Sequence, residues 1–134
     1  MRLLLGHDDA VAQWVGWKIG VPLSQPYTAI GWIDDPGHLQ VGFVFHNYVP
    51  GGNIEIAVAA SGMLTRSILA TVGNYAFNQA GARRIMARTP ASNKKACDIL
   101  QRIGFVKESV CRHFYPDDDA AQYRLLKKDA ERWL

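Results

Sequence analysis

Residues 82–105, ARRIMARTPASNKKACDILQRIGF, decide which fold this chain can adopt. The first part predicts a short strand at 83–89, which Pro90 ends. Ser92 or Asn93 then caps a helix, because short polar side chains accept hydrogen bonds from the free N–H groups of a first turn. Gly104 closes that helix. The predicted core stripe of the helix consists of apolar residues at helical spacing: Ala96, Ile99, Leu100 and Ile103.

The elements on both sides extend this pattern into a mixed α/β domain. Predicted strands cover residues 2–5, 27–34, 38–49, 53–60, 105–115 and 120–128. Two further helices begin near residues 8 and 65, and they end near Gly20 and Gly81. We therefore expect one domain over residues 1–134, an α/β fold with a mostly antiparallel sheet of six to seven strands flanked by three to four helices.

The composition indicates an ordinary globular protein. Hydrophobic residues make up 49% of the chain and charged residues 20%, with a formal net charge of +3. That mild charge does not by itself indicate nucleic-acid binding. No apolar run approaches the ~20 residues that span a membrane, and the start lacks the apolar core of a signal peptide. We therefore expect a cytoplasmic location, no membrane contact, and free thiols at Cys97 and Cys111.

The opening stretch resembles the GCN5-related N-acetyltransferase (GNAT) superfamily. The resemblance rests on the arginine-rich strand, on Asn93 followed by Ala96, and on Gly104-Phe105 at the end of the helix. Residues 74–85 are also similar to the ribosomal-protein acetyltransferase branch, and the whole chain resembles small acetyltransferases of phages and prophages. The resemblance implies the GNAT fold and an enzyme that moves an acetyl or other acyl group from coenzyme A to a primary amine. The amine of a small molecule or protein would attack directly in a ternary complex.

The resemblance assigns roles to two polar residues. Asn93 matches the asparagine that contacts the pantetheine arm of coenzyme A, and its side-chain amide offers both a donor and an acceptor. The position of Asn93 also predicts a helix cap, and one asparagine can both cap the helix and contact the pantetheine arm. Glu55 lies on the strand that lines the family's cleft, where a glutamate often acts as general base. The alternative for Glu55 is a surface side chain on the polar side of a half-buried strand.

One position departs from the family pattern. Leu100 stands where family members usually have a tyrosine that protonates the departing thiolate. The catalytic candidates beside Glu55 are Tyr48 and Cys97, as possible substitutes for this proton donor. Other substitutes remain open: His46, Tyr115 and Tyr123. A further alternative is that no dedicated acid is needed, since a thiolate is a fairly good leaving group.

The joint AVAASGMLTRS, residues 57–67, is the predicted phosphate-binding loop. It lacks the second glycine of the family's Q/R-x-x-G-x-G/A loop, so the expected contacts come from helix N–H groups, a left-handed backbone at Gly62 and the Arg66 side chain. The basic run from Arg83 to Lys95 would face the 3′-phosphate. The alternative is a tight turn with a Ser or Thr cap. The cofactor-binding candidates are Val58, Ala60, Gly62, Leu64, Thr65, Arg66, Asn93 and Lys95.

Several alternatives remain at this point. A nucleic-acid-modifying acyltransferase and a non-catalytic binding module can use the same fold, although nucleic acid is not the favoured partner. Cys111 and His113 form one pair of metal-ligand types, which is too few for a zinc site, so no metal is expected. The acidic run Asp117–Asp119 can attract a polycationic acceptor, and Trp133 is compatible with a homodimer contact.

Overall fold

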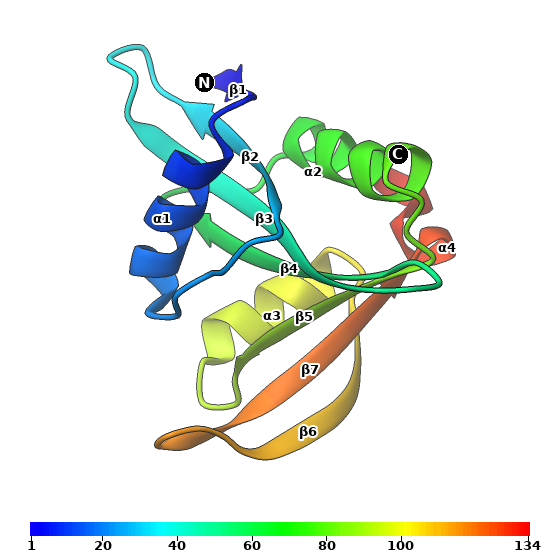
Figure 1. Ribbon diagram of the computed structural model, residues 1–134. Coiled ribbons are helices and arrows are strands. Elements are labelled where there is room, and N and C mark those ends of the chain that lie inside the picture. The colour runs from blue at the N-terminus through cyan, green and yellow to red at the C-terminus, as the bar shows by residue number, and fades with distance from the viewer.

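The computed structural model describes residues 1–134 and contains one seven-stranded sheet, in the order β1-β2-β3-β4-β5-β7-β6 (Figure 1). The strands are β1 (Arg2–Leu4), β2 (Thr28–Ile33), β3 (Leu39–Val49), β4 (Asn53–Ala60), β5 (Arg84–Pro90), β6 (Val106–Tyr115) and β7 (Asp118–Leu126). The helices are α1 (Asp8–Ile19), α2 (Arg66–Gly73), α3 (Lys94–Arg102) and α4 (Lys127–Ala130). A π-helix (Asn74–Gln79) continues α2, and a 3-10 turn (Glu131–Trp133) follows α4.

This architecture confirms the predicted mostly antiparallel sheet with flanking helices. Every neighbouring pair of strands is antiparallel except β4 and β5, which run parallel. The parallel pair follows from the α2 crossover, because a parallel connection must return over one face of the sheet. None of the helices combines the length and the apolar character that a membrane crossing requires.

Alternation along the strands divides the core between the two faces of the sheet. Ile54 and Ile56 of β4 point into the larger core cluster, which lies under α2 and α3. The opposite face carries α1, whose Val11 and Val15 pack against Val44 and other small residues of the central strands. Glu55 lies between Ile54 and Ile56, so its side chain points to the α1 face.

The C-terminus packs into the core and explains a glycine inside a helix. Gly73 ends α2 directly where the π-helix begins, and the indole of Trp133 lies against it. The Trp133 side chain is 4% exposed, and its Nε1 donates a hydrogen bond to the Ile103 carbonyl at 2.8 Å. The expectation that Trp133 offers a dimer contact is therefore wrong, because its surface is buried within the chain.

The helix α3 differs from its predicted pattern in one respect. Leu100 and Ile103 pack against the larger core cluster, and Phe105 is 4% exposed, as the periodicity predicts. Ile99, however, is 36% exposed, so its assignment to the core is wrong. The stripe of α3 that packs against the cluster consists of Cys97, Leu100 and Ile103, so the side of the helix that carries Ile99 remains exposed.

A substitution at Gly73 tests this packing of the C-terminus. A Cβ atom at residue 73 would lie 2.6 Å from Leu134 Cδ2 and 2.9 Å from Trp133 Cζ3. We expect Gly73→Ala to destabilise the protein by roughly 1 kcal/mol or more, because overpacking outweighs alanine's better helix propensity. Thermal unfolding measures the change. Gly62→Ala is the matched control, because a Cβ there meets open space; a Gly73→Ala variant as stable as the wild type would contradict the packing.

Candidate functional site

The sheet opens between its two parallel strands. The β4–β5 register consists of Asn53 with Arg84, Ile54 with Ile85, and Glu55 with Met86, and pairing ends there. Beyond this point β4 pairs only with β3, and β5 pairs only with β7. Figure 1 shows the two strands diverging from each other toward their carboxyl ends. The backbone groups of residues 56–60 that point away from β3 therefore face an opening, and they are free to pair with an extended ligand.

Each diverging strand is followed by the N-terminus of a helix. Thr65 caps α2, since its Oγ1 accepts a hydrogen bond from the Ile68 N–H at 3.3 Å. Asn93 caps α3 by accepting from the Ala96 N–H at 3.1 Å. The N–H groups of the first α2 residues have no backbone partner, as expected at a helix start. The carboxyl ends of adjacent parallel strands and free helix N–H groups are where α/β proteins commonly bind phosphorylated ligands.

The predicted phosphate loop is only partly as expected. Seven glycines of the chain have a positive φ, but Gly62 does not, so the expectation of a left-handed backbone at this residue is wrong. Nothing lies within 4 Å of its Cβ position, so its backbone is open to a ligand. Leu64 packs partly against the core, Ala60 is exposed, and Arg66 is exposed with no ion-pair partner. Val58 contacts the core from β4.

The basic run does not form one surface. Arg84 forms an ion pair with Glu108 and donates to Asn53, and Arg88 forms an ion pair with Glu55. Both arginines alternate with Ile85 and Ala87, which point into the larger core cluster, so they lie on the face opposite to α2. The expectation that the whole run faces one phosphate is therefore wrong. Lys95 lies exposed in the first turn of α3.

Glu55 is the last β4 residue that pairs with β5, and its side chain is buried. The residue is 9% exposed, which excludes the alternative of a solvated surface glutamate. Its Oε1 accepts hydrogen bonds from Asn47 Nδ2 at 2.9 Å and from Arg88 Nη2 at 3.1 Å. The Arg88 guanidinium also lies 4.7 Å from the ring centroid of Phe114 on β6. Three strands and the β6–β7 hairpin thus fix this carboxylate.

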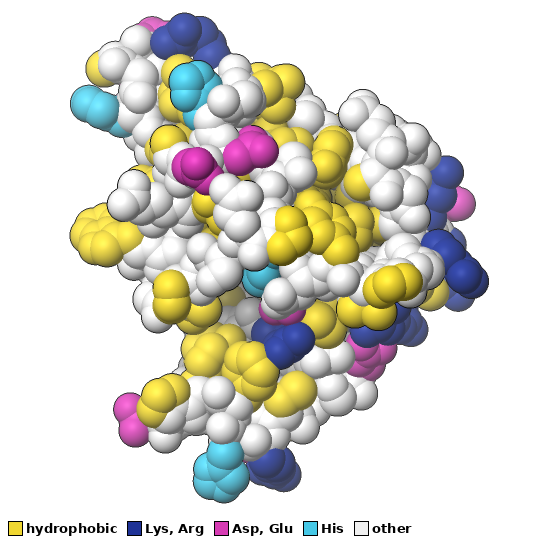
Figure 2. All heavy atoms as spheres, viewed as in Figure 1, with side chains coloured by type: hydrophobic (Ala, Val, Ile, Leu, Met, Phe, Trp, Pro, Cys, Tyr) yellow, Lys and Arg dark blue, Asp and Glu magenta, His cyan; other side chains and the backbone are white.

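His46 lies directly opposite Glu55 in the β3–β4 pair. It is 8% exposed, and its Nε2 has no hydrogen-bond partner. Burial lowers the pKa of His46 below its ordinary value, and the Arg88 cation lowers it further, while Glu55 acts in the opposite direction. Figure 2 shows a small group of histidine, acidic and basic atoms near the centre of the face that carries α1, surrounded by hydrophobic side chains.

The end of β3 departs from simple alternation. Asn47 has a positive φ of 50°, and the register with β4 shifts between His46 and Val49. Tyr48 is consequently 42% exposed, and its hydroxyl donates to the Phe45 carbonyl at 3.0 Å, whereas His46 is buried. Asn47 reaches Glu55 instead. The signal available in the sequence was the tolerance of asparagine for a left-handed backbone at a bulge.

The second catalytic candidate, Cys97, lies on the other face of the sheet. It packs against the larger core cluster beside Tyr123 of β7. Burial and the neighbouring Cys97 thiol raise the pKa of Tyr123 to about 12. Neither residue contacts Glu55, because Tyr123 is turned toward α3 and Glu55 toward α1. Tyr115 lies close enough to Arg88 and Glu55 to be affected by their charges. Burial raises the pKa of Tyr115, while the Arg88 cation lowers it and the Glu55 charge raises it.

The acidic run at the β6–β7 turn is engaged within the chain. Asp118 accepts hydrogen bonds from the Ser92 N–H at 3.0 Å and the Ser92 hydroxyl at 2.6 Å, which ties this turn to the start of α3. Asp119 accepts from Arg112 and from the His113 N–H. These hydrogen bonds lower the pKa of both carboxyl groups. Two of the three aspartates therefore serve the hairpin, contrary to a free acidic surface for a polycation.

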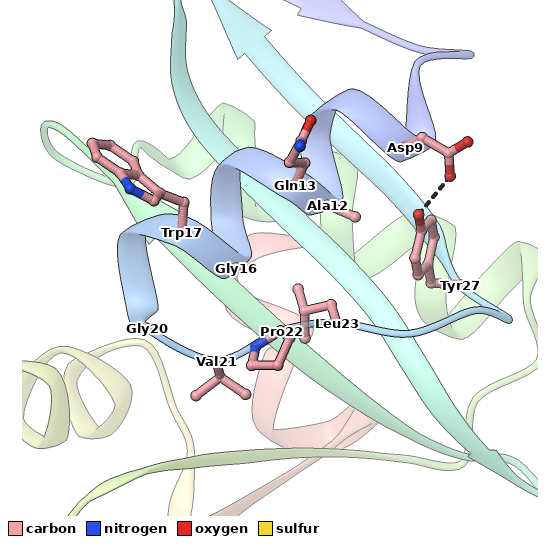
Figure 3. A pocket seen from close by; sticks show the side chains of 10 residues that line it. All are labelled: Asp9, Ala12, Gln13, Gly16, Trp17, Gly20, Val21, Pro22, Leu23 and Tyr27. Atoms are coloured by element: carbon pink, nitrogen blue, oxygen red, sulfur yellow. Dashed lines mark hydrogen bonds between the residues drawn. The ribbon is translucent and has the colours of Figure 1, made fainter.

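A groove of about 650 Å³ runs between α1 and the segment that leads to β2 (Figure 3). Asp9 closes one end by accepting hydrogen bonds from the Tyr27 hydroxyl and from Gln25 Nε2. The bond to Asp9 raises the pKa of Tyr27. Trp17 on α1 is 76% exposed. The groove is lined by Asp9, Ala12, Gln13, Gly16, Trp17, Gly20, Val21, Pro22, Leu23 and Tyr27.

Nowhere in the structure do three or more His, Cys, Asp or Glu side chains lie close enough together to hold a metal ion.

Comparison with known proteins gives matches among solved structures. No family model and no curated protein matches the chain. The F149A mutant of spermidine N-acetyltransferase SpeG from Vibrio cholerae superposes with a TM-score of 0.77 at 12% identity, over 98% of this chain and 99% of that chain. SpeG in complex with manganese ions gives 0.75 at 12% identity, over 98% and 95%. The ribosomal-protein-S5-alanine acetyltransferase from Vibrio fischeri gives 0.67 at 17% identity, over 77% and 63%.

These superpositions concern architecture, because the identities are low. They cover almost the whole chain in the case of SpeG, including the seven-stranded sheet and its helices. The implied fold is confirmed: the chain has the fold of the GCN5-related N-acetyltransferases.

Proposed function

We propose that this protein is an N-acyltransferase that moves an acetyl or other acyl group from coenzyme A to a primary amine by direct attack in a ternary complex. The observation that carries the proposal is the opening between β4 and β5, with the buried Glu55 carboxylate at its closed end. The structural neighbours support it, since they are named as acetyltransferases of spermidine and of a ribosomal protein.

The residues around the opening fit coenzyme A. The exposed edge of β4, with Val58 and Ala60, offers N–H and C=O groups to the amides of the pantetheine arm. The N–H groups of residues 64–67, the Thr65 hydroxyl and the Arg66 guanidinium suit the pyrophosphate. Asn93 uses only Oδ1 for its cap, so its amide nitrogen remains free to donate. Lys95 adds positive charge nearby. When bound, coenzyme A supplies the acyl group as a reactive thioester.

Glu55 is the proposed general base. An amine acceptor arrives as an ammonium ion at neutral pH, and it must lose a proton before its nitrogen lone pair can attack. Asn47 and Arg88 both donate hydrogen bonds to Oε1, and these contacts fix the orientation of the carboxylate. The second oxygen, Oε2, remains free to accept a hydrogen bond from the ammonium. The carboxylate thus attracts the acceptor, orients its nitrogen and takes its proton.

We assign no residue of the chain as the proton donor to the leaving thiolate. Leu100 packs into the core at the position of the family's tyrosine, and Cys97 lies beside Tyr123 on the opposite face from Glu55. Tyr48 bonds to its own strand. The proposal therefore adopts the alternative without a dedicated acid, in which the thiolate leaves without prior protonation.

The first test concerns the shortened phosphate loop. We expect Arg66→Glu to weaken acetyl-coenzyme A binding by about tenfold, because a charge-assisted contact becomes a repulsion. Isothermal titration calorimetry measures the dissociation constant. Lys128→Glu is the control, since it makes the same charge change on an exposed residue of α4. Equal affinities of the two variants would contradict the proposed phosphate site.

The second test concerns Glu55. We expect Glu55→Gln to lower kcat for an amine acceptor by about 10²–10⁴ with little change in acetyl-coenzyme A affinity, because the amide keeps the shape but cannot take the proton. Steady-state kinetics with a panel of primary amines, including spermidine and an alanine peptide, measures the effect. Glu131→Gln is the matched control on an exposed residue. A wild-type protein that binds the cofactor but acylates no amine would instead favour the non-catalytic binding module.

A further inference from the structure

One histidine of this chain differs from the other three. His7, His38 and His113 are exposed to solvent, whereas His46 is 8% exposed. No hydrogen bond of the structure involves the His46 imidazole, and its Nε2 is fully buried. A buried polar atom without a partner is uncommon in folded proteins, and it usually has a functional or a solvent partner. The role of His46 therefore follows from what surrounds it.

The surroundings of His46 consist of charged groups from two neighbouring strands. Glu55 on β4 is its direct cross-strand partner, so the two side chains leave the same face with Cβ atoms roughly 5 Å apart. Arg88 on β5 forms an ion pair with Glu55 and acts on the imidazole as a nearby cation. Tyr115 on β6 experiences the charges of the same arginine and glutamate. The imidazole thus faces one carboxylate and one guanidinium.

The ion pair between Glu55 and Arg88 makes it unfavourable for Glu55 to keep the proton that it takes from the amine. A protonated Glu55 is neutral, and the largely buried Arg88 guanidinium would then lose the charge that compensates it. A proton acceptor beside Glu55 removes this conflict, because the carboxylate regains its charge when the proton moves on. Among the neighbouring groups only the imidazole has an unoccupied nitrogen lone pair near neutral pH.

We propose that His46 is the proton-accepting partner of Glu55, so that the carboxylate and the imidazole act together as the base that deprotonates the acceptor amine. This inference rests on the proposed function. In the first step an N–H bond of the ammonium breaks and an O–H bond forms on Glu55. In the second step that O–H bond breaks and an N–H bond forms on the imidazole. The products are a neutral amine with a free lone pair, an ionised Glu55 and an imidazolium at residue 46.

The protonation state of His46 suits this role. Its lowered pKa keeps the imidazole neutral, and thus able to accept a proton, at neutral pH and for some distance below pH 6.5. As the pH falls through that lowered pKa, the imidazole becomes charged and can no longer accept. The ionised Glu55 opposite stabilises the imidazolium while it exists, because it is the one nearby group that raises the His46 pKa.

The test combines kinetics with histidine titration by NMR. His46→Gln should lower kcat at pH 7 by at least about tenfold. We also expect the wild-type kcat to fall as the pH drops through the lowered His46 pKa, and His46→Gln should abolish that fall with the same amine. His38→Gln is the matched control, because His38 is exposed and lies in the β2–β3 turn. Thermal unfolding of each variant verifies that it is folded at the assay temperature.

The NMR measurement uses variants that keep His46 in place. Glu55→Gln should lower the pKa of the His46 imidazole, because it removes the neighbouring negative charge, and Arg88→Met should raise it. The inference is upheld if these opposite shifts occur and the acid limb of kcat depends on His46. It is overturned if the His46 pKa is insensitive to Glu55→Gln, or if His46→Gln keeps the wild-type profile. A wild type that acylates no amine at any pH overturns the proposed function itself.

Discussion

The end of hydrogen bonding between β4 and β5 is the constraint on which the rest of the structure depends. These strands share only three register pairs, and the last of them contains Glu55. Each strand remains anchored on its outer side, β4 by β3 and β5 by β7, so the sheet stays continuous while its centre opens. The opening creates an unpaired strand edge inside a protein, and it places a buried carboxylate at the point of divergence.

The carboxylate is kept in place by an arrangement that only the whole fold provides. Burying a charge is unfavourable unless it is paired and hydrogen-bonded, and Glu55 receives Arg88 from β5 and Asn47 from the bulge of β3. Arg88 is in turn covered by Phe114 from the β6–β7 hairpin. The hairpin is tied to the start of α3 through Asp118 and Ser92. The same contacts that satisfy the charge therefore connect the two halves of the sheet around the opening.

Much of this could be predicted from the sequence because it depends on local patterns. Alternation in β4 separates Glu55 from Ile54 and Ile56, and the caps at Thr65 and Asn93 follow from residue type and spacing. The partners of Glu55 could not be predicted, because Asn47 reaches it only through a bulge and Arg88 only through a parallel register between distant segments. The burial of Trp133 and the exposure of Ile99 likewise depend on packing between distant parts of the chain.

The central claim is that the opening between β4 and β5 holds coenzyme A, and residue-resolved amide hydrogen exchange tests it most directly. With saturating acetyl-coenzyme A we expect slower exchange at residues 64–67 and at those residues of 56–60 whose N–H groups point away from β3, because these unpaired N–H groups would gain partners. The groove beside α1 should show no protection. Protection confined to that groove, or no change at all at saturating cofactor, would contradict the account.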